Sequence, residues 1–363
     1  MCGIFGMVGK NGGTMEESRI NSIITSLSHR GPDGHGVAKF PTATLVHTRL
    51  SIIDLGGGAQ PMKDSEKYIN ITSNAEIYNY KELKSAFEEK GHTFTTNSDT
   101  EVILKSYLEY GEKCPEYLDG MFAFAIWDED KKSLFIARDR FGKKPLYYST
   151  DEKGNFYFAS EIKALFAAGL KGIVDVEAID NYLTLMYVPP WKTIYKNIHT
   201  IHGAHAGIVK NGEIKIWRYW ELKDAPITPT YDEAKKEVER LFADSVRKRM
   251  IADVEVGSLL SGGIDSTLVT AYAKKHNPSI KTFTVGYGEH INELPFAKEA
   301  SEKIGTDHYT LQARDNLLEE LKKVIEYMDE PHADSSNLSQ HLVSKLASSK
   351  VKVALSGDGA DEL

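Results

Sequence analysis

The order of apolar and polar positions changes near residue 225, and the two sides of that point predict different architectures. Before it, short runs that alternate or are wholly apolar are typical of strands. Such runs lie at residues 3–9, 43–48, 67–73, 122–128 and 133–138, and a predicted hairpin covers 145–160. Helical spacing is found at residues 14–31, 79–91 and 99–111. Thr14 and Glu17 have the spacing of a capping box for the first of these helices. Strands clustered with a few helices favour a layered α+β domain.

The second half of the chain alternates helix and strand in a regular order. After the proline-containing stretch 223–230, helical patterns and apolar runs follow one another from residue 231 to residue 357. Such alternation is typical of a parallel sheet with helices packed on its faces. The sequence therefore predicts two domains, residues 1–221 and 231–363, joined by a short linker.

Composition and charge exclude several classes of protein. The net charge of −8 comes from 52 acidic and 44 basic residues without long runs of either sign, which argues against nucleic acid or a membrane surface as partner. No apolar run reaches the length of a membrane span, and no secretory signal precedes the first motif. Two cysteines, Cys2 and Cys114, are not a disulfide framework. We therefore expect a cytoplasmic protein.

Cys2 is the first candidate for chemistry. Removal of Met1 would place a thiol and a free α-amino group on the same residue. An α-amine has a pKa near ~7.7–8.0, so part of it is free base at neutral pH and can activate the thiol. Taken alone, a cysteine at this position is more often incidental than catalytic.

Polar residues in later motifs strengthen the hypothesis of a nucleophilic cysteine. An arginine can clamp an α-carboxylate, carboxylates can hold an α-ammonium group, and an amide with a backbone N–H can stabilise an oxyanion. The residues concerned are Arg49, Asn74, Glu76 and Asp99. Each also has an ordinary interpretation as an ion pair, a turn residue or a helix cap. Together with Cys2 they match the parts that hydrolysis of glutamine needs.

The second half carries a motif of its own, SLLSGGIDS at residues 258–266. It predicts a strand, a glycine-rich turn and the start of a helix. Backbone N–H groups of residues 261–264 can converge on a phosphate, whose charge the helix N-terminus favours, although the motif lacks a Walker A lysine. A related motif, SGDGADE, follows another predicted strand at residues 356–362. The two motifs predict a nucleotide site.

The order and content of these motifs resemble a known family. The runs MCGIFG, HRGPDG, RLSIID, NAEIYN, SDTE, MFAFAIWD, RDRFGKKPLYY and FASEIKAL are similar to the glutaminase domain of class II glutamine amidotransferases. Across nearly the whole chain, the sequence is most similar to the glutamine-hydrolysing asparagine synthetase family. The resemblance implies an N-terminal-nucleophile αββα sandwich, followed by an α/β parallel-sheet ATP-binding domain of the pyrophosphatase-loop type.

The resemblance also implies the site residues. Cys2 would be the nucleophile, and Asn74 with the N–H of Ala75 would form the oxyanion hole. The implied glutamine ligands are Arg49, Leu50, Ser51, Ile52, Ile53, Asn74, Ala75, Glu76 and Asp99. The implied ATP ligands are Leu259, Ser261, Gly262, Gly263, Asp265, Ser266, Val285, Ser356 and Gly357. Asp265 and Asp361 would bind Mg²⁺, and Asp358 would lie near an acyl-adenylate.

Two positions depart from the family pattern. Ala75 stands where relatives have glycine, so we expect slower glutamine hydrolysis, through strain if the backbone needs φ > 0 or through crowding by the methyl group. Asp358 stands where glutamate is common, which shortens the reach of the carboxylate by one methylene.

The implied reaction is glutamine-dependent asparagine synthesis. Glutamine is hydrolysed to glutamate and ammonia at Cys2, aspartate is adenylated with ATP, and ammonia displaces AMP. Two alternatives stay open: amidation of another carboxylate acceptor, and a glutaminase-only or sensing fragment. Family members continue past residues 361–363, so we expect an incomplete synthetase half. The family also implies a homodimer.

Overall fold

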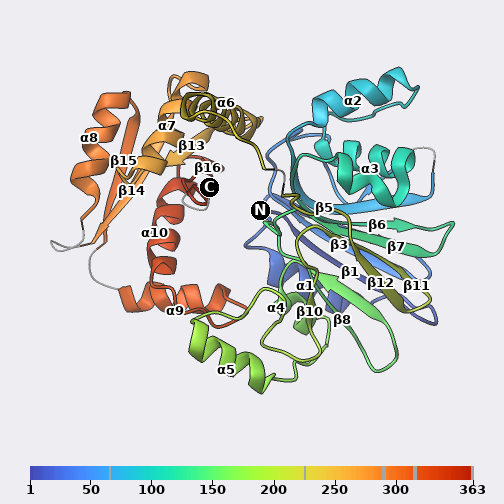
Figure 1. The fold of residues 1–363 in the computed structure, drawn as a ribbon. Helices are drawn as coiled ribbons and strands as arrows, with labels where there is room; N and C mark the ends of the chain where they lie inside the picture. Colours follow the sequence, from blue (N-terminus) through green and yellow to red (C-terminus); the bar gives the residue numbers. More distant parts are fainter. Residues whose placement is uncertain (65–66, 225, 288–291, 314–316, 361–363) are drawn as a thin grey trace. The chain divides into compact units, whose positions relative to one another are not determined.

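The computed structural model describes residues 1–64, 67–224, 226–287, 292–313 and 317–360 (Figure 1). The chain divides into two compact units. The first unit holds Met1–Lys223 together with Asp329–Ala333, and the second holds Asp224–Met328 and Asp334–Leu363. A five-residue segment from late in the sequence therefore belongs to the amino-terminal unit.

The first unit contains two six-stranded sheets whose strand pairs are antiparallel. One sheet has the order β10 (His199–Thr200), β8 (Tyr147–Thr150), β9 (Phe156–Ala159), β1 (Gly3–Val8), β3 (Ala43–Arg49), β2 (Gly34–Lys39). The other has the order β12 (Glu213–Arg218), β11 (His205–Lys210), β7 (Ser133–Arg138), β6 (Gly120–Asp128), β5 (Ile69–Ile77), β4 (Met62–Lys63).

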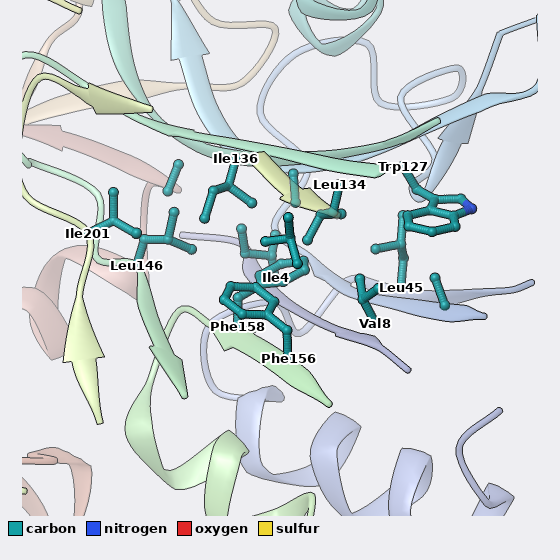
Figure 2. Packing of buried hydrophobic residues seen from close by; sticks show 14 residues of the cluster. Ile4, Val8, Leu45, Trp127, Leu134, Ile136, Leu146, Phe156, Phe158 and Ile201 are labelled. Atoms are coloured by element: carbon teal, nitrogen blue, oxygen red, sulfur yellow. The ribbon is translucent and has the colours of Figure 1, made fainter. Parts of the chain in front are cut away.

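The main core of this unit lies between the two sheets, as Figure 2 shows. Side chains alternate across a strand, so β1 sends Ile4 and Val8 into this core and Phe5 and Met7 toward its other face. Trp127 of β6 belongs to the same buried cluster as Ile4 and Val8. The alternation explains why β1, which is buried throughout, reads in the sequence as a continuous apolar run.

Helices cover the outer faces of both sheets. α1 (Glu17–Leu27) and α4 (Ile162–Ala167) join β1 in the second buried cluster. α3 (Asp99–Tyr110) lies against the other sheet, where the Tyr107 ring stacks on Phe135 of β7 with centroids 5.4 Å apart, and α2 (Tyr80–Glu89) packs on α3. A 3₁₀ helix (Gly111–Tyr117) and α5 (Val176–Leu185) complete the unit. The predicted αββα sandwich is confirmed.

One predicted local feature is wrong. α1 begins at Glu17 after Glu16, and no side chain caps it, so Thr14 and Glu17 form no capping box. A capping box is found instead at α6 (Tyr231–Arg249), where the Thr230 hydroxyl accepts from the Glu233 N–H and the Glu233 carboxylate accepts from the Thr230 N–H.

The second unit is built on a four-stranded parallel sheet with the order β15 (Asp307–Ala313), β14 (Lys281–Tyr287), β13 (Val256–Leu259), β16 (Val353–Leu355). The helices of this unit are α6, α7 (Ile264–His276), α8 (Leu294–Ile304), α9 (Leu317–Tyr327) and α10 (Ser336–Ser348). One buried cluster joins β13 and β16 to α6 and α7, and another joins β14 to α10. The predicted α/β parallel-sheet domain is confirmed.

The strand order of this sheet reverses between β13 and β16. The chain runs from β13 outward to β14 and β15, then returns to add β16 on the opposite side of β13. Ligands of open α/β sheets bind outside the carboxyl ends of the strands at such a switch point. None of the helices in the described ranges combines the length and apolar composition that crossing a bilayer requires.

Candidate active site

The Cys2 thiol lies immediately before β1 and is held by the backbone of Leu50. The Leu50 N–H donates to Sγ at 3.4 Å, and the thiol donates to the Leu50 carbonyl oxygen at 3.6 Å. Burial raises the pKa of the thiol, while the Leu50 hydrogen bond and the nearby α-amino group act in the opposite direction. A thiol in this state needs a base to become a nucleophile.

An α-amino group lies beside the thiol. In the structure it belongs to Met1, whose side chain is half exposed. Burial of the amino group lowers its pKa to about 6, and the positive charges of Arg30 and Lys144 add to that effect. Most of the group is therefore uncharged at neutral pH.

Arg30 ties the backbone of Cys2 to the outer helical layer. Its Nε donates to the Cys2 carbonyl oxygen at 2.9 Å, and its Nη1 donates to the Glu161 carboxylate at 2.8 Å. Burial raises the pKa of Glu161, but hydrogen bonds from His29 and Arg30 outweigh it and hold that pKa at about 2. The sequence places Arg30 before a rigid turn without giving it a role.

A pocket opens beside Cys2, and most of the predicted glutamine ligands line it. These are Arg49, Leu50, Ile52, Ile53, Asn74, Ala75, Glu76 and Asp99. Ser51 is not among the lining residues, and its N–H donates to the Asp33 carboxylate at 2.8 Å instead. Five positions that the sequence did not single out as ligands line the pocket as well: Gly58, Gln60, Ser73, Ser98 and Thr100. Lys144 is a further addition.

The Arg49 guanidinium is fixed by the carbonyl groups of the loop that follows it. Nη2 donates to the Asp54 carbonyl oxygen at 2.6 Å, and Nη1 donates to the Leu55 carbonyl oxygen at 3.1 Å. A Cβ at Gly58 would lie 2.4 Å from Nη2, so only glycine leaves the guanidinium this space. The arrangement holds a cation at one end of the pocket.

Two carboxylates share another part of the pocket. Asp99 is the first residue of α3, and its Oδ2 accepts from the Ile77 N–H at 3.0 Å. Burial raises the pKa of Asp99 to about 6. Burial and then the charge of Asp99 raise the pKa of Glu76 to about 8. Two buried carboxylates that lie close together disfavour the state in which both are ionised. A cationic ligand group would stabilise that state.

Asn74 supplies an unsatisfied donor. It lies in β5 opposite Ala123 and is 2% exposed, and its Nδ2 has no hydrogen-bond acceptor among the described residues. A buried amide without a partner requires an explanation, and a charged oxygen in the pocket would provide one. Ala75 follows it in the same strand and is not among the residues with positive φ. The expectation of backbone strain at Ala75 is therefore wrong, because the extended strand accommodates any residue.

The predicted nucleotide motifs meet at the switch point of the parallel sheet. Residues 260–263 follow β13, and residues 356–359 follow β16. A Cβ at Gly357 would lie 2.9 Å from the Ser266 nitrogen and 3.0 Å from the Asp265 Cβ. The second motif therefore lies directly against the amino-terminal turn of α7.

The turn between β13 and α7 leaves several donors free. Ser261 Oγ accepts from the Gly263 N–H at 3.2 Å, and the Ser266 hydroxyl accepts from the Ser261 N–H at 3.2 Å. The N–H groups of residues 262 and 264–266 find no acceptor within the described ranges. Gly262 has φ +85, and a Cβ there would lie 2.5 Å from the Phe296 carbonyl carbon. This cradle of N–H groups fits a phosphate.

Some of the remaining predicted nucleotide residues lie in the core of the second unit, and others lie after β16. Val285 is buried in β14, and Leu259 packs against the Phe283 cluster, so both are part of the core. The Ser356 hydroxyl donates to the Asp358 carboxylate at 2.9 Å. Asp361 lies outside the described residues. No group of three or more metal-binding side chains occurs in the part of the chain that the structure describes, so Asp265 would need ligand oxygens to complete a magnesium site.

Comparison with known proteins finds a matching family for each half of the chain. Residues 1–220 match the family model of the glutamine amidotransferase domain, and residues 237–363 match that of asparagine synthase. The chain is 38% identical to asparagine synthetase [glutamine-hydrolyzing] 1 of Bacillus subtilis over all of its length and 58% of that protein. It is 37% identical to putative asparagine synthetase [glutamine-hydrolyzing] 2 of Methanocaldococcus jannaschii, over all of its length and 75% of that protein. The chain belongs to the glutamine-hydrolysing asparagine synthetase family.

This member of the asparagine synthetase family spans about three fifths of its Bacillus subtilis relatives, 58% of one and 62% of another. Among solved structures, the allosteric regulatory enzyme of purine biosynthesis superposes with a TM-score of 0.47 at 15% identity, over 94% of this chain and 91% of that one.

Gln60 and Lys144 are two of the additional residues that line the pocket. The Gln60 Oε1 accepts from the Ser73 N–H at 2.6 Å, and its Nε2 donates to the Thr100 hydroxyl at 3.1 Å. Gln60 thus joins the strand that carries Asn74 to the helix that begins with Asp99. For Lys144, the available signal was its place in RDRFGKKPLYY, a run that carries the resemblance to the asparagine synthetase family.

Proposed function

We propose that this protein makes asparagine from aspartate, with glutamine as nitrogen donor and ATP as energy source. Residues 1–221 are assigned as the glutamine amidotransferase domain and residues 231–363 as the ATP-binding domain. The observation that carries the proposal is the pocket in which the Cys2 thiol, the unpaired Asn74 amide and the Glu76–Asp99 pair lie together.

The charged groups of that pocket complement the two charged groups of glutamine. Its α-carboxylate pairs with the Arg49 guanidinium, and its α-ammonium group lies against Glu76 and Asp99. The remaining predicted contacts come from Leu50, Ser51, Ile52, Ile53, Asn74 and Ala75. The side-chain amide then reaches Cys2.

Hydrolysis follows from the groups around the thiol. After Met1 is removed, the α-amine of Cys2 takes the thiol proton, and the sulfur attacks the amide carbon. The Asn74 Nδ2 and the Ala75 N–H hold the oxyanion that forms. The protonated amine gives its proton to the leaving nitrogen, and ammonia departs. Water then cleaves the thioester, which yields glutamate and restores the thiol.

The second domain is proposed to bind ATP at the switch point. The free N–H groups of the turn hold phosphate oxygens, with contacts from Ser261, Gly262, Gly263, Ser266, Ser356 and Gly357. Leu259 and Val285 flank the base. ATP would activate the side-chain carboxylate of aspartate by transferring AMP to it with release of pyrophosphate, and ammonia would then displace AMP to form the amide. Asp265 and Asp361 would hold Mg²⁺, which would supply positive charge for the phosphate groups, and Asp358 would lie near the activated aspartyl group.

The remaining assignments follow the family. We assign the protein to the cytoplasm and to a homodimer, with small molecules as its other partners. Neither a nucleic-acid nor a membrane partner is proposed, because the charge of −8 is spread without a basic patch in the sequence.

The test is an assay that reads glutamate, AMP and asparagine separately, with glutamine, aspartate and ATP supplied together and in turn omitted. All three products are expected in equal amounts in the complete mixture. Cys2→Ala should abolish glutamate release while asparagine still forms from added ammonia. Glutamate release without asparagine under any nitrogen source would overturn the synthetase part, and no glutamate release at all would overturn the whole proposal.

A further inference from the structure

Lys144 is a buried cation that the hydrolysis scheme above leaves without a task. It is 6% exposed and lines the pocket with Cys2 and Glu76. Its ammonium group makes no hydrogen bond or ion pair at contact distance with any described residue. An ammonium group that lines a pocket and lacks a partner among the described residues can act through its charge on the groups around it.

The loop that carries Lys144 is fixed in place by its neighbours. The Asp139 carboxylate accepts from the N–H groups of Lys144, Lys143, Phe141 and Phe122 at 2.9–3.2 Å. The Arg138 guanidinium donates to the Lys144 carbonyl oxygen at 2.6 Å. Because these bonds hold the backbone on both sides, the side chain enters the pocket from a rigid base.

Lys144 acts on four other titratable groups of the pocket. Its charge lowers the pKa of the Cys2 thiol, of Glu76 and of Asp99, and it also lowers the pKa of the α-amino group. Burial lowers the pKa of Lys144 itself, while Glu76, Cys2 and Asp139 raise it and Arg30 lowers it further. The second cation at the pocket, Arg49, is already held by backbone carbonyl groups.

We propose that Lys144 is the counter-ion of the glutamine pocket, which keeps Glu76 ready for the ammonium group of glutamine and favours the anionic form of the Cys2 sulfur. It acts through these two residues and is a positioning residue rather than a catalytic one. The inference rests on the proposed glutaminase function. It predicts that removing the charge of Lys144 moves the working range of the site to higher pH.

Two neutral variants and two controls test this role. K144M and K144Q remove the charge with different polarity, K144R restores it, and K143M makes the same charge change at the exposed neighbour. The first readout is kcat/KM for glutamate release between pH 6 and 9.5. The second is the rate at which iodoacetamide alkylates Cys2 over the same range without glutamine, which needs no turnover.

The neutral variants should move the midpoints of both profiles upward by about one pH unit and lower kcat/KM at pH 7 by about tenfold, with recovery at high pH. K144R and K143M should keep the midpoints of the unmodified protein. Unchanged midpoints in folded K144M or K144Q would overturn the inference, and so would a loss of folding in both, because Lys144 would then be structural. If the unmodified protein releases no glutamate, the proposed function fails, while the alkylation profile still reports on Lys144.

Discussion

The pocket at Cys2 and the loops after β13 and β16 prepare for their ligands in opposite ways. At Cys2, charged side chains are buried and fixed before any ligand arrives, and the pKa values of Glu76 and Asp99 are raised as a result. At the switch point, the prepared groups are backbone N–H donors on a turn that is largely open to solvent.

The difference matches the ligands proposed for the two sites. Free glutamine carries one positive and one negative group and no net charge. A pocket that binds it therefore has to supply a counter-charge for each group. A nucleotide brings several negative charges, so neutral donors and a helix N-terminus are sufficient. Substitutions should therefore act through side-chain charge at the first site and through backbone shape at the second.

The largest effect is expected at the nucleophile. Cys2→Ala should lower glutamate release by at least ~10³-fold, because no other group can form the thioester. Nucleotide binding to the second unit should be unaffected. Cys114→Ala, at the fully buried cysteine, should keep glutaminase activity. A much smaller loss in Cys2→Ala would show that Cys2 is not the nucleophile.

The next effect concerns backbone shape at the turn. Gly262→Ala would force an L residue to φ +85 and push a Cβ against Phe296, so nucleotide affinity should fall by about 10–100-fold. Gly263→Ala should cost much less, because the nearest atom to its Cβ is the Ser261 hydroxyl at 3.3 Å. Calorimetry with ATP measures both affinities. Equal losses in the two variants would contradict the shape argument, and a change in glutaminase kinetics would contradict the separation of the sites.

A third effect concerns pH. Glu76 is mostly protonated at pH 6 because its pKa is about 8, and the ammonium group of glutamine favours the ionised form. The KM for glutamine should therefore fall by about tenfold between pH 6 and 8 and level off above that range. Glu76→Gln should flatten this dependence, whereas Glu82→Gln on the exposed face of α2 should leave it intact.

The same pKa shift has the opposite consequence for stability. Between pH 4.5 and 8 the folded protein holds a proton on Glu76 that the unfolded chain has released, so the free energy of unfolding should decrease as pH rises through that window. Thermal melts without glutamine measure this trend. A melting temperature that rises with pH in the native protein but not in Glu76→Gln would contradict the assignment.

The smallest effect is expected at Ala75. The strand geometry removes the argument from strain, which leaves crowding by one methyl group in the pocket. Ala75→Gly should raise kcat/KM for glutamine hydrolysis by roughly twofold to fivefold. Steady-state kinetics that match those of the native protein would show that the Ala75 methyl group does not slow glutamine hydrolysis.

Sequence reasoning found residues whose chemistry is visible in a local motif. Cys2 at the start of the chain, Asp99 at a helix start and the glycine-rich turn at 261–263 each have a local signature, and the structure brings them to the expected surroundings. The pattern of apolar residues also predicted a layered α+β domain and a parallel sheet, while the two-sheet sandwich came from the family resemblance.

The sequence did not predict the residues that reach the pocket only through tertiary contacts. Gln60 and Lys144 reach the pocket from loops that no local pattern links to Cys2. Asp329–Ala333 belongs to the first unit, where Asp329 and Glu330 accept hydrogen bonds from the N–H groups of Ile162 and Ile194, more than 100 residues earlier in the chain. The supposed cap at Thr14 failed because spacing shows only that two side chains can meet, while packing of α1 decides where the helix begins.

The proposed hydrolysis requires a thiol and a free amine on the first residue of the working enzyme. The most direct measurement is mass spectrometry of the protein after reaction with a glutamine analogue that carries an electrophilic carbon in place of its side-chain amide. The label should appear on a peptide that begins at Cys2 with an unmodified amine, and glutamate release should fall in proportion to labelling. Label on Cys114, or active protein that keeps Met1 or an acetylated amine, would contradict the claim.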